Sequence, residues 1–89
     1  MEKIKKLIVS NNKPNIIITN FYKIKYVDDN NKNRFMFFSY SNGHFSCYSR
    51  DVGWKSIEEK KDTIENKFNK FIDFVNNFKK NNKIIKEYL

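Results

Sequence analysis

The chain has 89 residues, a formal net charge of +8, and aromatic side chains at 17% of its positions. This length allows a single domain, residues 1–89, and the one cysteine excludes an intramolecular disulfide. No apolar run approaches the roughly 20 residues that a membrane-spanning helix needs. The apolar run at residues 7–9 is also too short for a signal peptide, so we expect a cytoplasmic protein.

The N-terminal third predicts a short element followed by a long strand. Residues 2–9 place apolar residues at helical spacing, which favours a short helix, and a strand over residues 6–9 is the alternative. Pro14 separates this element from the next, because the residue before a proline disfavours helix. Residues 16–27 are rich in β-branched and aromatic residues, and they alternate in polarity from Tyr22 onward. They predict a long strand.

A β-hairpin is the clearest local signal in the chain. The polar residues 28–33 read as a loop, after which Asn42-Gly43 separates two β-rich runs, residues 34–41 and 44–50. Asn-Gly supplies the positive φ angles of a type I′ turn, and that turn fixes the register of the two strands. The predicted pairs are Ser41 with His44, Tyr40 with Phe45, Ser39 with Ser46, Phe38 with Cys47, Phe37 with Tyr48, and Phe35 with Arg50.

The two faces of this hairpin differ in polarity. The more apolar face, which we expect to cover the core, consists of Met36, Phe38, Tyr40, Phe45 and Cys47. The other face carries Phe35, Phe37, Ser39, Ser41, His44, Ser46, Tyr48 and Arg50. The face to which Tyr22, Ile24 and Tyr26 belong stays open, because the six-residue loop does not fix the register of the first strand.

A helix is predicted to begin shortly after the hairpin. Residues 51–55 read as a turn, and Ser56 followed by Glu59 forms a capping box at N-cap and N3. Acidic residues at 58, 59 and 62 would lie at the positive end of the helix dipole.

The helix is expected to run from about residue 57 to about residue 78. One apolar stripe supports it, formed by Ile57, Ile64, Phe68, Phe71, Val75 and Phe78. Two asparagines at residues 81–82 weaken helix, so a break with a short last turn competes with a continuous helix. The fold class is therefore α+β, in which a three-stranded antiparallel meander of residues 16–27, 34–41 and 44–50 packs against this helix.

Neither a metal site nor a catalytic site is predicted. His44 and Cys47 form a His-x-x-Cys pair, but the chain has no further histidine or cysteine to complete a zinc site. The hairpin register also places these two residues on opposite faces, which excludes a Cys-His nucleophilic pair. We expect no cofactor and no enzymatic activity.

Two surfaces are candidate binding sites. Phe35, Phe37 and Tyr48 lie side by side on the second hairpin face, with Arg50 and His44 at its edges. Rings flanked by cations on an open sheet stack the bases of single strands. Alternatively, the N-terminal segment buries this face, or the helix packs on it. The basic residues Lys79, Lys80, Lys83 and Lys86 form the second candidate surface, as a contact for phosphate or for an acidic partner.

The composition bears on the kind of function. The chain has sixteen Lys, fourteen Asn and eleven Ile but no Ala and no Gln, which indicates an AT-rich genome and assigns part of the charge to codon usage. We expect a small non-catalytic protein of a phage or mobile element that occludes a macromolecular partner, as an inhibitor of a nucleic-acid-handling complex would. Direct binding of single-stranded nucleic acid is the alternative. The heptad-like helix stripe leaves both a monomer and a homodimer open.

Overall fold

Five strands and one long helix form most of the part of the chain that the structure describes, residues 5–6, 17–41, 43–57 and 62–89 of a computed structural model. The elements are β1 (Ile17–Val27), β2 (Asn33–Ser41), β3 (His44–Ser49), β4 (Gly53–Ser56), α2 (Ile64–Asn81) and β5 (Lys83–Tyr88). The strands form one antiparallel sheet in the order β4-β3-β2-β1-β5. The α+β class is confirmed, with two strands more than the predicted meander. Lys5 and Lys6 are helical, and the rest of the predicted element at residues 2–9 lies outside the described residues.

The predicted register of the central hairpin is confirmed. The five β2–β3 pairs run from Ser41 with His44 to Phe37 with Tyr48, and the predicted pair of Phe35 with Arg50 is not among them. Gly43 has a φ of 84°, the left-handed conformation that the turn requires, while Asn42 lies outside the described residues. The strand ends at Ser49, one residue earlier than predicted.

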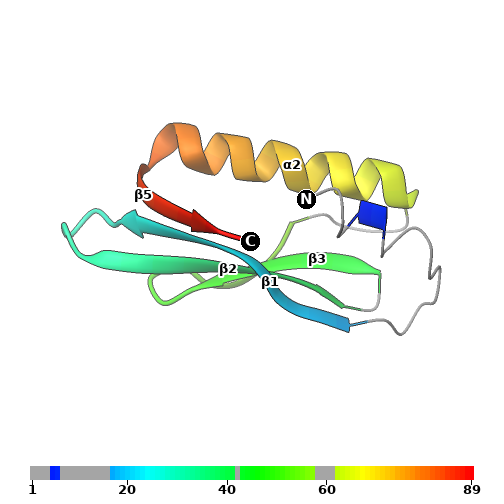
Figure 1. Ribbon diagram of the computed structural model, residues 1–89, viewed down its shortest axis with the longest axis horizontal. Coiled ribbons are helices and arrows are strands. Elements are labelled where there is room, and N and C mark those ends of the chain that lie inside the picture. The colour runs from blue at the N-terminus through cyan, green and yellow to red at the C-terminus, as the bar shows by residue number, and fades with distance from the viewer. Residues whose placement is uncertain (1–4, 7–16, 42, 58–61) are drawn as a thin grey trace.

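The predicted core face is also confirmed, and α2 covers it (Figure 1). Its members Met36, Phe38, Tyr40, Phe45 and Cys47 are all buried. Phe71 of α2 is completely buried, and its ring stacks on Phe45 with the centroids 4.8 Å apart. The register of β1 on β2 settles the open question about the first strand: Tyr22 pairs with Phe38 and Ile24 with Met36, so Tyr22, Ile24 and Tyr26 belong to the core face.

A bulge in β1 adds one more ring to the core. Asn20 has a φ of 50°, and the β1–β2 register shifts between Ile18 and Tyr22. The Ser39 hydroxyl stabilises the bulge, because it accepts a hydrogen bond from the Asn20 backbone N–H and donates one to its side-chain oxygen. Between these pairs β1 has two residues more than β2, which lets Phe21, next to the inward-facing Tyr22, also contact the core ring of Phe71.

The predicted start of the helix is wrong. Ser56 is the last residue of β4 and pairs with Ser46, and the backbone N–H of Ile57 donates to Phe45, which extends the ladder. A residue held in a sheet cannot serve as N-cap of a helix that begins at once. The helix begins instead at Ile64, with Thr63 as its N-cap, while Glu59 of the predicted capping box lies outside the described residues.

Two alanine substitutions test this position of the helix start. The Thr63 hydroxyl accepts a hydrogen bond from the backbone N–H of Asn66 at 3.2 Å. Thr63→Ala should therefore lower the free energy of unfolding by about 1 kcal/mol. Ser56→Ala, on an exposed edge strand, should change it by less than about 0.5 kcal/mol. Urea denaturation measures both, and a larger loss for Ser56→Ala would instead support the capping box.

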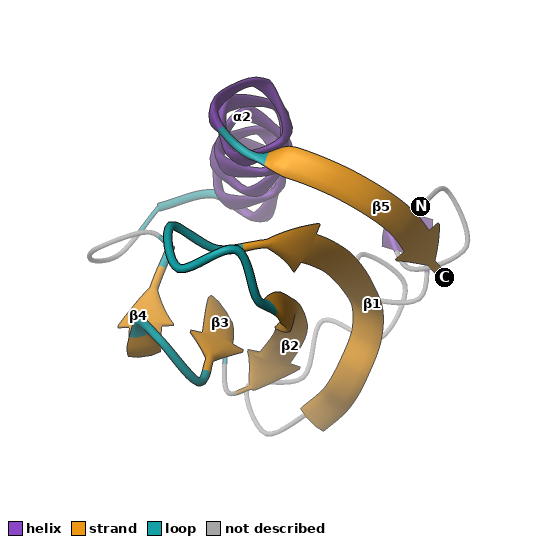
Figure 2. Cartoon of the chain, turned by 90° about the vertical axis from the view of Figure 1, so that its left-hand side faces the viewer, coloured by secondary structure: helices purple, strands orange, loops and turns teal. Residues whose placement is uncertain are grey.

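The helix ends three residues after the predicted position, and the segment that follows is a strand and not a short helical turn. α2 continues to Asn81, and the chain then turns into strand β5, which runs back along β1 (Figure 2). Asn82 is extended at a φ of −133°, and its side-chain amide donates to the carbonyl of Phe78 at 2.9 Å. β5 covers the outer edge of β1, and Ile84 packs against the core. Pairing with a strand some 60 residues away thus replaces the short helical turn expected from the local sequence.

Candidate functional site

A row of aromatic side chains crosses the sheet on the face opposite α2. Cross-strand pairing joins Trp54 to Tyr48, Tyr48 to Phe37, Phe37 to Lys23, and Lys23 to Tyr88, so that each of the five strands contributes one residue. Phe35 completes the set that we call the aromatic row: Trp54, Tyr48, Phe37, Phe35 and Tyr88. No described element packs on this face, because α2 lies on the other side of the sheet (Figure 2).

The rings of the aromatic row contact one another and remain accessible. Tyr48 and Trp54 have centroids 5.0 Å apart, and Phe35 lies 5.9 Å from Phe37 and 6.2 Å from Tyr88. Trp54 is 71% exposed, whereas the other four rings are partly buried against their neighbours on the sheet. Such a surface offers ring faces at little entropic cost, because neighbouring strands hold the rings in place.

Lysines lie among these rings. The Lys23 ammonium is 4.7 Å from the ring centroid of Tyr88 and 5.0 Å from that of Phe35. Lys25 lies 5.8 Å from Phe35, and Lys86 lies 5.0 Å from Tyr88. These distances are within the range of cation–π attraction. The face therefore combines rings with positive charge.

Acidic side chains are missing from the strand positions of this face that the structure describes. The cross-strand pairs that share it are Ile17–Ser41, Lys23–Phe37, Lys25–Phe35, Val27–Asn33, Lys23–Tyr88, Lys25–Lys86, Val27–Lys83, Phe37–Tyr48, Ser39–Ser46, Ser41–His44, Ser46–Ser56 and Tyr48–Trp54. Four lysines thus stand on it without an acid, which gives the face a positive potential that attracts anions.

A shallow hollow of about 380 Å³ lies beside the middle three rings of the aromatic row. Its lining residues are Asn33, Arg34, Phe35, Phe37, Tyr48 and Arg50. The Arg34 side chain donates to Asp28 at 3.0 Å, so its charge is partly neutralised. Backbone N–H groups of Lys32 and Asn30, together with Arg34, lower the pKa of Asp28. Arg50 is exposed at the rim of the hollow.

The predicted site residues divide into two groups. Phe35, Phe37, Tyr48 and Arg50 lie together, as expected from the hairpin register. His44 is exposed and pairs with Ser41 at the turn end of the hairpin, away from that hollow.

The predicted basic segment does not form one surface. Lys79 and Lys80 belong to the last turn of α2, where Lys79 contacts Glu87 at 3.1 Å. Lys83 and Lys86 belong to β5, and their pairing with β1 places them on the face of the aromatic row.

Four residues of this surface were missing from the sequence-based prediction: Trp54, Tyr88, Lys23 and Lys25. The alternation of residues 22–26 places Lys23 and Lys25 on one side of their strand. The register with β2, which the sequence leaves open, decides that this side is the face of the aromatic row. The sequence predicts a turn at Trp54, because a strand of four residues is too short to show a period. Tyr88 belongs to strand β5, whereas the sequence predicts either continued helix or a short last turn after residues 81–82.

On the helix side, Tyr22 and Glu87 connect β1 to β5. The Tyr22 hydroxyl donates a hydrogen bond to the Glu87 carboxylate, which also contacts Lys79. That bond from Tyr22 lowers the pKa of Glu87 below its ordinary value of 4.5. Burial, together with the nearby carboxylate, raises the pKa of Tyr22.

This pair predicts a pH-dependent contribution to stability. Because the folded protein favours ionised Glu87, the contribution is present above the unfolded pKa and is lost as the pH falls through the lower folded pKa. Tyr22→Phe should therefore be less stable than the parent at about pH 7, and the difference should shrink as the pH falls to about 3. Urea denaturation across this range measures it. Tyr48→Phe, on the opposite face, should show no such convergence, and a pH-independent loss in Tyr22→Phe would contradict the assignment.

Asp51, Tyr26 and Cys47, near the core, have structural roles. Asp51, predicted near a helix start, instead accepts hydrogen bonds from Tyr26 and Ser49. Burial, then the bond to Asp51, raises the pKa of Tyr26 to about 12. Burial raises the pKa of the Cys47 thiol to about 11, which leaves little thiolate at neutral pH.

Within residues 5–6, 17–41, 43–57 and 62–89, no cluster of three or more His, Cys, Asp or Glu side chains could hold a metal ion. The same residues contain no helix long and apolar enough to cross a membrane. No protein-family model, curated protein or solved structure matches the chain.

Proposed function

We propose that this protein binds single-stranded nucleic acid on the open face of its sheet, without catalysis. The observation that carries the proposal is the aromatic row, which combines five rings with Lys23, Lys25 and Lys86 on a face that α2 leaves uncovered. Every base has a π-face, so rings on a sheet can stack bases whatever their sequence. Lysines beside the rings can contact the phosphates that follow each base.

The length of the aromatic row suits an extended single strand of nucleic acid. Four steps between neighbouring strands, each of about 4.8 Å, give roughly 19 Å from β4 to β5. A single-stranded nucleic acid that crosses the sheet from β4 to β5 would meet Trp54 first and Tyr88 last. In the free protein, Lys23 lies over three of the rings. We propose that a stacking base displaces this flexible side chain, whose ammonium then reaches a neighbouring phosphate.

Fluorescence anisotropy of a labelled random oligonucleotide tests this function through its salt dependence. For single strands, the logarithm of affinity falls with the logarithm of salt concentration at about 0.7 per phosphate contact. Lys25→Gln with Lys86→Gln removes two such contacts and should reduce the slope by about 1.4. Lys70→Gln with Lys80→Gln is the matched control, since it removes the same charge from α2. Equal slopes for the two double variants would contradict a site on the sheet.

A protein partner is the second candidate. Trp54, Tyr48 and Arg50 lie close to one end of the face, and these residue types dominate the energetics of protein interfaces. The lysines of this face would then select an acidic surface, as a protein that occupies the nucleic-acid site of a larger complex requires. Such a protein would bind its partner through Trp54 but would leave free oligonucleotides unbound at low salt.

A further inference from the structure

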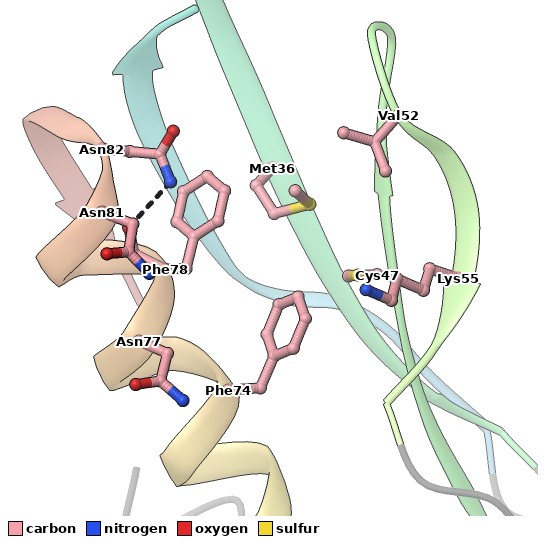
Figure 3. Close-up of a pocket in the computed structure, with 9 residues that line it drawn as sticks. All are labelled: Met36, Cys47, Val52, Lys55, Phe74, Asn77, Phe78, Asn81 and Asn82. Atoms are coloured by element: carbon pink, nitrogen blue, oxygen red, sulfur yellow. Dashed lines mark hydrogen bonds between the residues drawn. The ribbon is translucent and has the colours of Figure 1, made fainter.

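A second concave site lies on the helix side of the sheet, between the C-terminal half of α2 and strands β2, β3 and β4 (Figure 3). It has a volume of about 280 Å³, and its lining residues are Met36, Cys47, Val52, Lys55, Phe74, Asn77, Phe78, Asn81 and Asn82. The aromatic row lies on the other face of the sheet, so nothing in the proposed function uses this pocket.

The inner wall of the pocket is apolar. Met36 and Cys47 are at most 2% exposed, and they face the rings of Phe74 and Phe78 across the pocket (Figure 3). Those two rings are nearly parallel, with centroids 6.5 Å apart. Sulfur atoms and ring faces together accommodate a flat apolar group, because thioethers and thiols are polarizable.

The rim of the pocket is polar and carries one charge. Lys55 is the only ionisable cation among the lining residues, and its ammonium lies 5.5 Å from the Phe74 ring. Asn77 and Asn81 of α2 line the opposite side together with its C-cap Asn82 (Figure 3). The Asn82 amide already donates to the Phe78 carbonyl, whereas Asn77 and Asn81 are exposed. Ligand pockets commonly combine an apolar wall with a few polar groups that fix orientation.

We propose that this pocket binds a small aromatic carboxylate, with its ring between Met36 and Phe74 and its carboxylate at Lys55. A buried cavity of about 150 Å³ accepts benzene, so a pocket of this size has room for a ring system with a short polar group. Charge complementarity selects the anion, since the lining includes no acidic side chain. Cys47, though at the inner wall, stays chemically inert because its thiol is buried.

The geometry separates this site from the nucleic-acid site. Lys55 and Trp54 are consecutive residues of β4 whose side chains point to opposite faces of the sheet. A ligand in the pocket should therefore shift the resonance of the Met36 methyl group and leave the Trp54 indole unchanged. An oligonucleotide should shift the resonance of the Trp54 indole and leave the Met36 methyl group unchanged. Failure of one proposal is thus distinguishable from failure of the other.

The test is a titration with 1-naphthoate, followed by the carbon-13 resonance of the Met36 methyl group. We expect a saturable shift, and we expect the neutral analogue 1-naphthalenemethanol to bind several-fold more weakly. Lys55→Gln should weaken naphthoate binding by about three- to five-fold, the strength of an exposed ion pair, and leave the neutral analogue unaffected. The control Lys70→Gln removes a charge from the outer side of α2 and should change neither ligand.

Three results would overturn the proposal. One is a Met36 resonance that does not move up to the solubility limit of naphthoate. Another is equal affinity for the acid and the alcohol, which would remove the role of Lys55. The third is a naphthoate-induced shift of the Trp54 indole in place of Met36, which would locate binding on the other face.

Discussion

Phe71→Ala should lower the free energy of unfolding by about 3–5 kcal/mol, the cost of removing a buried phenylalanine ring and leaving its cavity. Phe71 is completely buried at the centre of the helix–sheet contact. Its ring contacts those of Phe21, Phe38, Phe45 and Phe68. A domain of this size has a free energy of unfolding near the low end of about 5–15 kcal/mol. The variant should therefore be close to unfolding at room temperature, with a Tm lowered by at least about 12 °C.

Urea and thermal denaturation, followed by circular dichroism, measure this effect. Leu89→Ala is the matched control, because Leu89 is 83% exposed and its truncation should cost less than about 0.5 kcal/mol. Phe71→Leu should fall between the two, since it keeps much of the apolar volume. A loss for Phe71→Ala no greater than that for Leu89→Ala would mean that α2 does not pack on the sheet through this ring.

Removing two rings of the aromatic row, with Phe37→Ala and Tyr48→Ala together, should nearly abolish single-strand binding. Each base–aromatic stack contributes roughly 1–3 kcal/mol, which corresponds to a loss of about 5- to 150-fold in affinity per ring. The two side chains are direct cross-strand neighbours, so a base that stacks on one lies beside the other. Their effects are therefore expected to differ from simple addition.

The control for this prediction keeps the rings and exchanges the hydroxyl. Phe37→Tyr with Tyr48→Phe preserves both ring faces and should bind with nearly the parent affinity. Both rings are only partly buried and lie outside the core cluster, so the alanine pair should still fold. Circular dichroism checks this. If the folded alanine pair binds as tightly as the parent, the bases do not stack on these rings.

Local sequence determined the central hairpin and little of what surrounds it. Asn42-Gly43 restricts the turn to one type, so strand register and both faces followed from the sequence. The helix start was different, because two capping signals compete within eight residues. Ser56 lies in a strand and Thr63 caps the helix. Only the pairing of β4 with β3 decides between them, and a four-residue strand shows no period of its own.

The candidate site, too, is partly determined by local sequence and partly by pairing between distant strands. Phe35, Phe37, Tyr48 and Arg50 could be grouped because they belong to one hairpin. Tyr88 could not, since its place depends on β5 pairing with β1, more than 60 residues away in sequence.

Lys23 lies in the site because of the register of β1, which the alternation of polar and apolar residues does not reveal. The bulge at Asn20 and the pairs that follow it set the register of β1. The local sequence predicts which side chains share a strand face, whereas contacts between distant strands decide which faces meet.

The proposed single-strand site is tested most directly by the fluorescence of Trp54. It is the only tryptophan of the chain, it is 71% exposed, and it ends the aromatic row, so its emission reports on this face alone. Titration with a random single-stranded oligonucleotide at low salt should give saturable quenching that added salt reverses, because phosphate contacts supply much of the affinity. Emission that stays unchanged throughout the titration would contradict binding of nucleic acid at this surface.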